Sequence, residues 1–242
     1  MMEKLYNREE DRRIIDDNLT RIRETIAAAC ARTGRPEEEV ALLAVTKTVS
    51  AERINTAIEL GVSRIGENRV QEYLGKRDDL QPIESHLIGH LQTNKVNQIV
   101  GKVDLIQSVD SLRLARAINE ASQKRGIISD VLVEVNIGGE ESKSGVTPEE
   151  AAAFCDELQQ FSALRLCGLM TVPPICDTER EKREYFSRMY RLFIDIRDKK
   201  SDNKSMNILS MGMSDDFAEA ILEGSTMVRI GSAIFGKRNY NI

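Results

Sequence analysis

The feature that most constrains the fold is an alternation of short apolar segments with longer amphipathic segments, repeated eight times along the chain. The short segments have the length and apolar content of buried strands, and the longer ones have the apolar spacing of helices. Strands that alternate with helices form the parallel sheets of α/β proteins. The predicted strands are 41–46, 64–66, 85–88, 105–109, 130–136, 165–171, 207–210 and 227–230.

Helices are predicted between these strands, and one more, at about 7–33, precedes the first strand. Ser50, Asp110, Thr147 and Ser214 stand just ahead of helices, where a side-chain oxygen can accept a hydrogen bond from the first turn. Thr147 and Glu150 have the spacing of a capping box. The helices between strands are predicted at 51–60, 68–76, 93–100, 111–125, 148–161, 178–199 and 215–222.

Eight strand–helix units can form either a closed barrel or an open eight-stranded sheet. The length of 242 residues suits a (β/α)₈ TIM barrel, and no G-x-G-x-x-G motif follows the first strand. We therefore predict one α/β domain over residues 1–242. The barrel is expected at 41–236, with an N-terminal helix within residues 1–35 packed on it.

Composition and charge exclude several classes of protein. The net charge of −5 and the lack of a basic stripe argue against a nucleic-acid partner. No apolar run approaches the roughly 18 residues of a membrane helix, and the charged N-terminus does not resemble a signal peptide. Four cysteines form no C-x-x-C pair. We expect a cytoplasmic protein with reduced thiols, no metal site and no membrane partner.

A lysine ends the first apolar strand, in the segment ALLAVTKTVS at residues 41–50. Strand alternation places Leu43, Val45 and Lys47 on one face. If that face points into the barrel, Lys47 stands at the carboxyl end of the strand, where such barrels have their active sites. Partial desolvation there favours a neutral amine that can attack a carbonyl. The alternative is a strand-end lysine that extends into solvent.

Two loops near the end of the chain have the composition of an anion site. Ser210, Met211 and Gly212 follow the seventh strand, and Gly231 and Ser232 follow the eighth. Small residues with free backbone N–H groups and hydroxyls can bind an anion, and barrels commonly hold a phosphate at these two loops. Alternatively, both are ordinary Ser-Gly turns.

Arg229 lies on the eighth predicted strand and shares a face with Met227 and Gly231. An arginine that points into a barrel needs a partner, because an unpaired buried charge is costly. The ring nitrogen of pyridoxal phosphate (PLP) is a fitting partner, and an outward ion pair with a helix is the alternative. An amine for an aldehyde, an arginine for a ring nitrogen and two anion loops together indicate PLP.

Seven segments carry a resemblance to a known family. The chain resembles the YggS/PROSC family of PLP-binding homeostasis proteins, which is related to the N-terminal barrel of alanine racemases. The segments cover almost all of the chain after the first helix: AVTK (44–47), IGENRVQE (65–72), HLIGHLQTNK (86–95), VNIGGEESKSG (135–145), GLMTVPP (168–174), SMGMSDDF (210–217) and VRIGSAIFG (228–236).

The resemblance implies a monomeric barrel that holds PLP as a Schiff base on Lys47. It implies Arg229 at the ring nitrogen and Asn68 near the cofactor, with His86 and Ile88 lining the ring pocket. The implied phosphate-binding residues are Ser210, Met211, Gly212, Gly231 and Ser232.

Carriage of PLP is favoured over catalysis. Racemisation needs two acid/base groups. Alanine racemases take the second, a tyrosine, from a second domain, and we expect no such domain here because the chain ends at Ile242. An arginine at the ring nitrogen also makes PLP a poorer electron sink. The resemblance implies a protein of PLP (vitamin B6) homeostasis that affects amino-acid and keto-acid balance, with PLP-dependent apoenzymes as possible recipients.

Three alternatives stay open. The first is a weak fold-type III PLP-dependent amino-acid racemase. The second is a Schiff-base aldolase that uses Lys47 without a cofactor, for which Glu134 is the obvious inward carboxylate in strands four to six. The third is a binding module that acts through a protein partner, with PLP as the signal.

Overall fold

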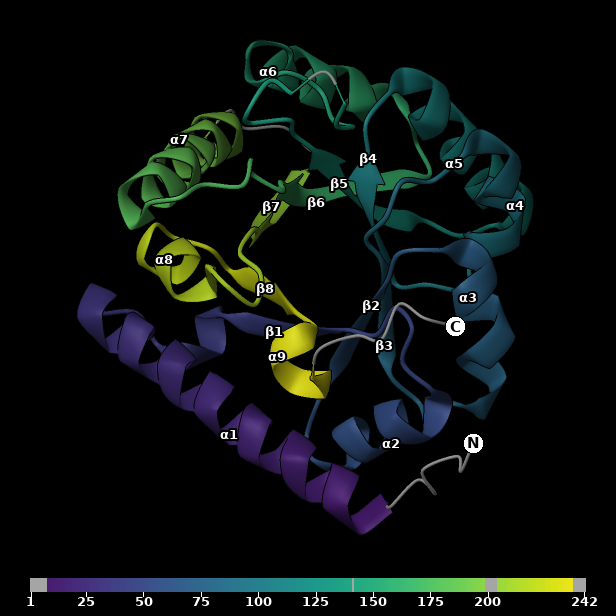
Figure 1. The fold of residues 1–242 in the computed structure, drawn as a ribbon. Helices are drawn as coiled ribbons and strands as arrows, with labels where there is room; N and C mark the ends of the chain where they lie inside the picture. The colour runs from purple at the N-terminus through teal and green to yellow at the C-terminus, as the bar shows by residue number, and fades with distance from the viewer. Residues whose placement is uncertain (1–7, 141, 199–203, 237–242) are drawn as a thin grey trace.

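Eight parallel strands close into a barrel in the computed structural model, which describes residues 8–140, 142–198 and 204–236 (Figure 1). The strands follow the chain order, and β1 closes the barrel by pairing in parallel with β8. The predicted (β/α)₈ barrel is thereby confirmed. The strands are β1 Ala41–Val45, β2 Arg64–Glu67, β3 Glu84–Leu87, β4 Leu105–Val109, β5 Ser129–Glu134, β6 Leu164–Met170, β7 Lys204–Ser210 and β8 Met227–Ile230.

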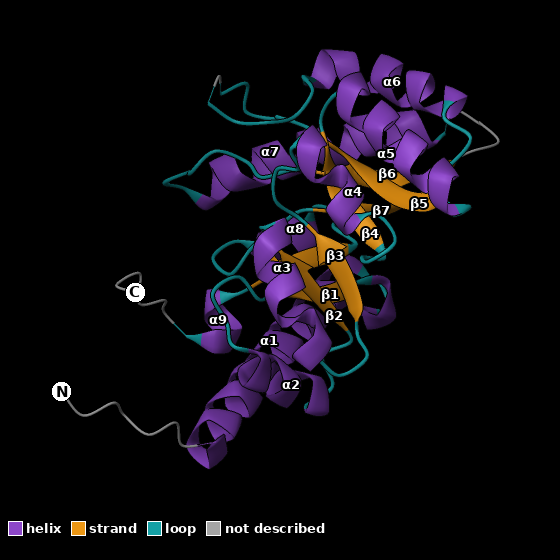
Figure 2. Cartoon of the chain, turned by 90° about the vertical axis from the view of Figure 1, so that its right-hand side faces the viewer, coloured by secondary structure: helices purple, strands orange, loops and turns teal. Residues whose placement is uncertain are grey.

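Helices surround the barrel, and the view in Figure 2 shows them on both sides of the strands. None of the helices in the described ranges has the length and apolar content needed to cross a membrane. The helices are α1 Arg8–Thr33, α2 Ala51–Glu59, α3 Val70–Lys76, α4 Val96–Ile99, α5 Leu112–Arg125, α6 Pro148–Glu157, α7 Glu179–Arg197, α8 Phe217–Leu222 and α9 Ser232–Phe235. Short 3₁₀ turns are η1 Glu37–Glu39, η2 Arg77–Asp79, η3 Thr93–Lys95 and η4 Leu158–Gln160.

The strands present alternate side chains to the barrel interior and to the helices. A Cβ atom built on Gly66 would lie 2.5 Å from Leu43 Cδ2 and 3.1 Å from Ile88 Cδ1, so these three residues face inward. Ala44 and Ile65, one position along, belong to the large apolar core that also contains the helices' buried residues. The predicted inward face of the first strand, which ends at Lys47, is confirmed by this arrangement.

The N-terminal helix α1 packs against α2, α8 and α9, beside the junction of β8 with β1 (Figure 1). Polar contacts tie the short helix α9 to this layer. Asn18 Nδ2 donates to the Ile234 carbonyl at 2.9 Å. Arg53 Nη2 donates to the Phe235 carbonyl at 2.9 Å, and Arg53 Nε donates to Asp11 at 2.8 Å. The layer therefore fixes α9, which begins at the mouth of the barrel.

The predicted helix starts are right in part. Thr147 and Glu150 form the expected capping box on α6. The cap of α5 is Ser111 rather than Asp110, since the Ser111 hydroxyl accepts from Leu114 N. Ser214 does not cap α8, which begins at Phe217. The predicted helix 148–161 changes to a 3₁₀ turn after Glu157, and the last residue of the predicted helix 178–199 lies outside the described residues.

Candidate functional site

A small pocket of about 170 Å³ opens at the carboxyl ends of β1, β7 and β8. It brings together three parts of the chain: the end of β1, the loop after β7, and the junction of β8 with α9. Barrels of this kind have their active sites at this end of the strands. The lining residues are Val45, Lys47, Met213, Ser214, Asp215, Arg229, Gly231 and Ser232.

Two larger hollows lie elsewhere, with volumes of about 370 and 690 Å³. One is bounded by α1, η1 and the segment 61–64, and the other runs along α7. Charged surface side chains make up much of both linings. Neither lining contains Lys47 or Arg229, so we assign the function to the smaller pocket on its chemistry rather than on its size.

Lys47 is partly buried at the pocket. No hydrogen bond or ion pair joins its amine to another residue in the described ranges, so the amine is available to a ligand. The next residue, Thr48, has a left-handed backbone with φ of 61°. A β-branched residue rarely adopts this conformation, and its cost of about 1–3 kcal/mol must be offset by the surroundings.

A clamp formed by Lys76 and Glu67 holds the loop that carries Lys47. The Lys76 amine donates to the carbonyls of Thr46 at 2.8 Å and Val49 at 3.3 Å, on either side of Lys47. It also pairs with buried Glu67 at 2.6 Å, and Glu67 accepts a hydrogen bond from the Thr46 hydroxyl. Burial raises the pKa of Glu67, and the Lys76 ammonium opposes that shift.

No predicted site residue belongs to this clamp. Its partners lie on a strand, a loop and a helix, and no local spacing connects them. The available signal was Glu67 itself, a carboxylate at the end of a short strand whose other residues are buried or half-buried. A buried carboxylate requires a partner, and the nearby helix carries Lys76.

Arg229 faces the barrel interior and is only 4% exposed. Its Nη1 donates to Ser210 Oγ and its Nη2 to the Thr171 carbonyl, each at 2.8 Å. Burial lowers the pKa of Arg229 to about 10, against the opposing effect of the Asp216 and Glu134 carboxyls. The side chain is therefore still a cation at neutral pH, and it presents N–H donors to the pocket that it lines.

The loop after β7 divides into a buried part and a pocket part. Ser210 and Met211 are fully buried. Gly212, at φ of 93°, packs so closely on α8 that a Cβ atom would lie 2.5 Å from Ala220 Cβ. Met213 and Ser214 are the members of this loop that line the pocket beside Asp215. The predicted stretch Ser210–Gly212 thus lies behind the pocket wall.

Ser214 lies in the loop predicted as an anion site, but it was predicted to cap a helix and was not among the predicted binding residues. Its hydroxyl accepts from the backbone N–H groups of Gly231 at 3.4 Å and Ala233 at 3.3 Å. It thereby joins the loop after β7 to the loop after β8. With predicted residues Gly231 and Ser232 it forms a polar wall of the pocket, and the second serine of the S-M-G-M-S motif was the signal for it.

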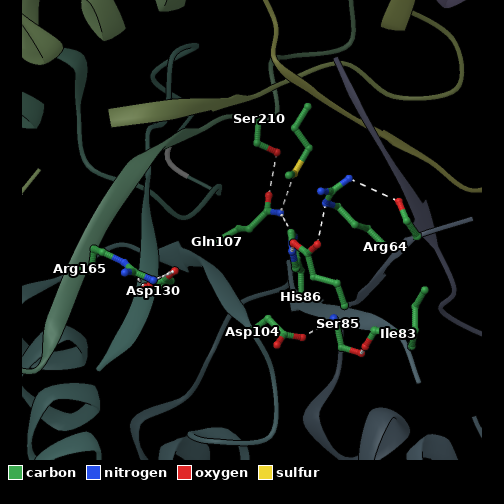
Figure 3. A network of polar contacts seen from close by, with 12 residues as sticks. Arg64, Ile83, Ser85, His86, Asp104, Gln107, Asp130, Arg165 and Ser210 are labelled. Atoms are coloured by element: carbon green, nitrogen blue, oxygen red, sulfur yellow. Dashed lines mark hydrogen bonds and ion pairs between the residues drawn. The ribbon is translucent and has the colours of Figure 1, made fainter. Parts of the chain in front are cut away.

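Three further predicted site residues differ in how they lie relative to the pocket: Asn68, Ile88 and His86. Asn68 follows β2, and its Oδ1 is buried with no hydrogen-bond partner among the described residues, so it has an unused acceptor. Ile88 contacts the inward face beside Gly66. His86 is 1% exposed, and its ring is bonded to Glu84 and Gln107 inside the barrel (Figure 3). It is absent from the residues that line the pocket.

Glu134 ends β5 and adds a titratable carboxyl on the same side of the barrel. Its Oε2 is buried with no hydrogen-bond partner in the described part of the chain. Burial raises the pKa of Glu134 to about 7, the Asp110 carboxylate adds to the increase, and Arg229 and His90 oppose it. This carboxyl can therefore hold or release a proton near neutral pH.

The pocket groups match the three ends of PLP. The Lys47 amine suits an aldehyde, the buried Arg229 donors suit a ring nitrogen, and the polar wall at 214 and 231–232 suits a phosphate. The unpaired Asn68 oxygen is a further polar contact for a ligand. Fold and pocket together define the class: a (β/α)₈ barrel with a lysine and a buried arginine at its mouth.

Comparison with known proteins gives the family. Residues 18–239 match the family described as alanine racemase, N-terminal domain. The pyridoxal phosphate homeostasis protein of Aquifex aeolicus is 43% identical over 226 residues, which cover 93% of this chain and 98% of that protein.

Solved structures agree with this relationship. An unknown protein from Bifidobacterium adolescentis superposes with a TM-score of 0.89 at 37% identity, covering 97% of this chain and 98% of that one. PipY of Synechococcus elongatus, solved with PLP bound, superposes with a TM-score of 0.76 at 31% identity, covering 89% and 100%. The chain therefore belongs to the alanine racemase N-terminal domain family and, within it, to the pyridoxal phosphate homeostasis proteins.

Proposed function

We propose that this protein binds PLP in the pocket at the barrel mouth. The Lys47 amine joins the aldehyde, Arg229 faces the ring nitrogen, and Ser214, Gly231 and Ser232 contact the phosphate. The observation that carries the proposal is that one pocket is lined by a buried arginine and by a lysine whose amine has no partner among the described residues. The PLP-bound structure of PipY, at 31% identity, supports it.

Each residue group has a defined task in this proposal. When bound, PLP would supply an aldehyde, and Lys47 is the residue that would hold it through its amine, with the carbonyl oxygen released as water. The Lys76–Glu67 clamp keeps the loop of Lys47 in place. Arg229 donates to the ring nitrogen and, as a cation, disfavours its protonation. The residues of the predicted phosphate site that lie behind the wall, Ser210–Gly212, support it from within.

We further propose that the protein holds and buffers PLP rather than turning over a substrate robustly. A ring nitrogen that faces a cation withdraws electrons weakly, which slows carbanion chemistry. The name shared by the curated relatives supports a role in PLP homeostasis. In this proposal, the effect on amino-acid and keto-acid balance follows from the supply of PLP to the enzymes that depend on it. In this proposal the protein is a cytoplasmic monomer, and PLP-dependent apoenzymes receive its cofactor.

Absorption spectroscopy with covalent trapping tests the binding proposal. Wild-type protein incubated with PLP should develop a visible band that borohydride removes, and mass spectrometry should then find the reduced adduct on the peptide containing Lys47. Lys47→Ala should give no such adduct, whereas Lys124→Ala, which changes an exposed lysine on α5, should resemble the wild type. A wild-type chain that PLP cannot colour would contradict the proposal.

Glu134 gives the alternative of a weak racemase some structural support, because it places a titratable carboxyl near Arg229. That reading requires a steady racemisation rate that is lost in both Lys47→Ala and Glu134→Gln. The homeostasis proposal expects no steady rate in any of the three proteins. A clean rate lost on removal of Lys47 would overturn the non-catalytic assignment.

A further inference from the structure

Five polar side chains cross the barrel interior in a continuous line of hydrogen bonds. Figure 3 shows the middle of this line, with Ser210, Gln107 and His86 labelled. We call them the core hydrogen-bond chain. It begins at Arg229 on the pocket and ends near the amino-terminal end of β3. The members in order are Arg229, Ser210, Gln107, His86 and Glu84, joined by distances of 2.8, 2.7, 2.8 and 2.9 Å.

The three middle members of the core hydrogen-bond chain are buried, so each of them needs hydrogen-bond partners inside the barrel. Ser210 and Gln107 are 0% exposed and His86 is 1% exposed. A buried polar group costs roughly 1–3 kcal/mol when it lacks a partner, so three such residues inside a barrel require complete pairing. The far end reaches partly exposed Glu84, which also binds Arg64 Nε at 2.8 Å.

The donors all point the same way. Arginine can only donate, so Ser210 Oγ accepts from Arg229 and gives its single proton to Gln107 Oε1. The Gln107 amide nitrogen then faces His86 Nδ1, and also Met227 Sδ at 3.2 Å. His86 Nδ1 must accept, which places the ring proton on Nε2, where it is donated to Glu84. The reversed amide would leave the Ser210 proton without an acceptor.

The charge at the far end fits this direction. The hydrogen bond from His86 lowers the pKa of Glu84, and the Arg64 guanidinium acts in the same sense, which outweighs partial burial. The chain therefore runs from a cation at the pocket to a carboxylate at the opposite end. Reversal of any one bond would break the bond next to it.

We propose that the core hydrogen-bond chain positions Arg229 for the ring nitrogen of bound PLP, with Gln107 and His86 as positioning residues that never touch the cofactor. The inference rests on the proposed function. Arg229 is held at one terminal nitrogen by Ser210 and at the other by the Thr171 carbonyl. Of these two hydrogen bonds, only the one to Ser210 depends on the core hydrogen-bond chain.

Nitrogen-15 NMR of the histidines tests the direction of the chain without PLP. The protein has two histidines, and His90→Gln assigns the signals. His86 should be the tautomer with the proton on Nε2. Gln107→Leu should move the Nδ1 signal, because that nitrogen loses its donor. A proton on Nδ1 of His86 in the wild type would overturn the inference, even if no variant within the core hydrogen-bond chain could be purified.

Spectra of bound PLP test the effect on the pocket. Gln107→Leu and His86→Leu should each shift the pH at which the visible band is half-lost and weaken PLP binding by about tenfold, since each interrupts one buried hydrogen-bonded chain. The double variant should show no more than the larger single effect, because both residues act through Ser210. Ser210→Ala should reproduce the shift with a smaller change in volume.

Asn119→Leu is the matched control. It also replaces a buried amide, which accepts from Ala163 N at 2.9 Å, but it lies on α5 outside the barrel. It should lower stability without moving the spectrum. If Gln107→Leu and His86→Leu bind PLP with the wild-type affinity and spectrum, the chain is merely structural and the inference fails alone. A wild-type protein that binds no PLP would overturn the inference together with the proposed function.

Discussion

The barrel interior has two parts with opposite chemistry. On the side of β4, β5 and β6, an apolar cluster consists of Leu105, Leu132, Cys167 and Met170, with Val172 and Ile208 packed against it. On the side of β3, β4, β7 and β8 lies the core hydrogen-bond chain. Strand β4 contributes to both, through Leu105 and Gln107. Apart from the partly exposed Glu84, the members of the chain are buried to a degree similar to the four residues of the cluster.

This contrast indicates that the apolar cluster mainly stabilises the fold, and that the core hydrogen-bond chain mainly positions its own side chains. Burial of aliphatic side chains stabilises the fold with little directional requirement. A polar chain gains little net free energy, but it permits one arrangement of its members. Substitutions in the apolar cluster should therefore change unfolding and spare the pocket, and substitutions that touch polar supports should change both.

The largest expected effect is on stability alone. Leu132 is 0% exposed in the apolar cluster, so Leu132→Ala should reduce the free energy of unfolding by about 2–5 kcal/mol. Urea unfolding measures the loss, and the absorption of bound PLP should stay as in the wild type. A shifted spectrum in this variant would remove the distinction between the two parts.

A second prediction concerns the Lys76–Glu67 clamp. Lys76→Met leaves Glu67, which is 1% exposed, without its counter-ion, and should cost about 3 kcal/mol. It also frees the loop around Lys47, so borohydride trapping of PLP should be slower. Adding Glu67→Gln removes the unpaired charge and should recover much of the stability but not the trapping rate. Equal recovery of both would mean that the clamp does not position Lys47.

The fold could be predicted because the apolar periods of strands and of helices are both strong in this chain. All eight strands were found from apolar runs, and β4 and β8 with their bounds unchanged. Helix α9 was missed, since four residues are too few to show a helical period. Strand β7 begins at Lys204 rather than 207, in a polar stretch that strand propensity does not favour.

The site could be predicted only where one strand's alternation was enough. Lys47 and Arg229 followed from the two-residue period of their own strands. Gln107 was overlooked as part of a buried strand, although a lone amide in LIQSV signals a partner inside the barrel. Its partner Ser210 is 103 positions away. Pairing over such a separation is set by barrel closure, which no local pattern reports.

The third prediction uses pH to separate the mouth of the barrel from the apolar cluster. The folded pKa of Glu134, about 7, lies above its ordinary value of 4.5. The folded state thus binds more protons between these values, and the free energy of unfolding falls as pH rises through them. Over this pH range the free energy of unfolding should fall by about 2–3 kcal/mol because of Glu134.

Glu134→Gln removes this titration. Urea unfolding of both proteins at pH 5 and pH 8 should show that the variant gains stability relative to the wild type only at the higher pH. Leu132→Ala should lower stability about equally at both values, because it removes no titratable group. The wild type and Glu134→Gln could instead differ in free energy of unfolding by the same amount at pH 5 and pH 8. That result would show that Glu134 does not titrate in this range.

The smallest expected effect is at an exposed ion pair between β5 and β6. Arg165 binds both oxygens of Asp130, at 2.6 Å each, and Figure 3 shows this pair apart from the core hydrogen-bond chain. The Arg165 side chain is 56% exposed, so solvent and salt screen the attraction. Arg165→Ala should change the free energy of unfolding by less than about 1 kcal/mol, and the change should shrink further in high salt.

Arg165→Ala also tests whether position in the barrel or membership of the chain decides the effect on the pocket. Both Arg165 and Arg64 are partly exposed arginines paired with a carboxylate, but only Arg64 is bonded to the chain through Glu84. The spectrum of bound PLP should therefore be unchanged in Arg165→Ala and shifted, slightly, in Arg64→Ala. Equal shifts in the two variants would mean that loss of any charge at this end of the barrel reaches the pocket, without a role for the hydrogen bonds.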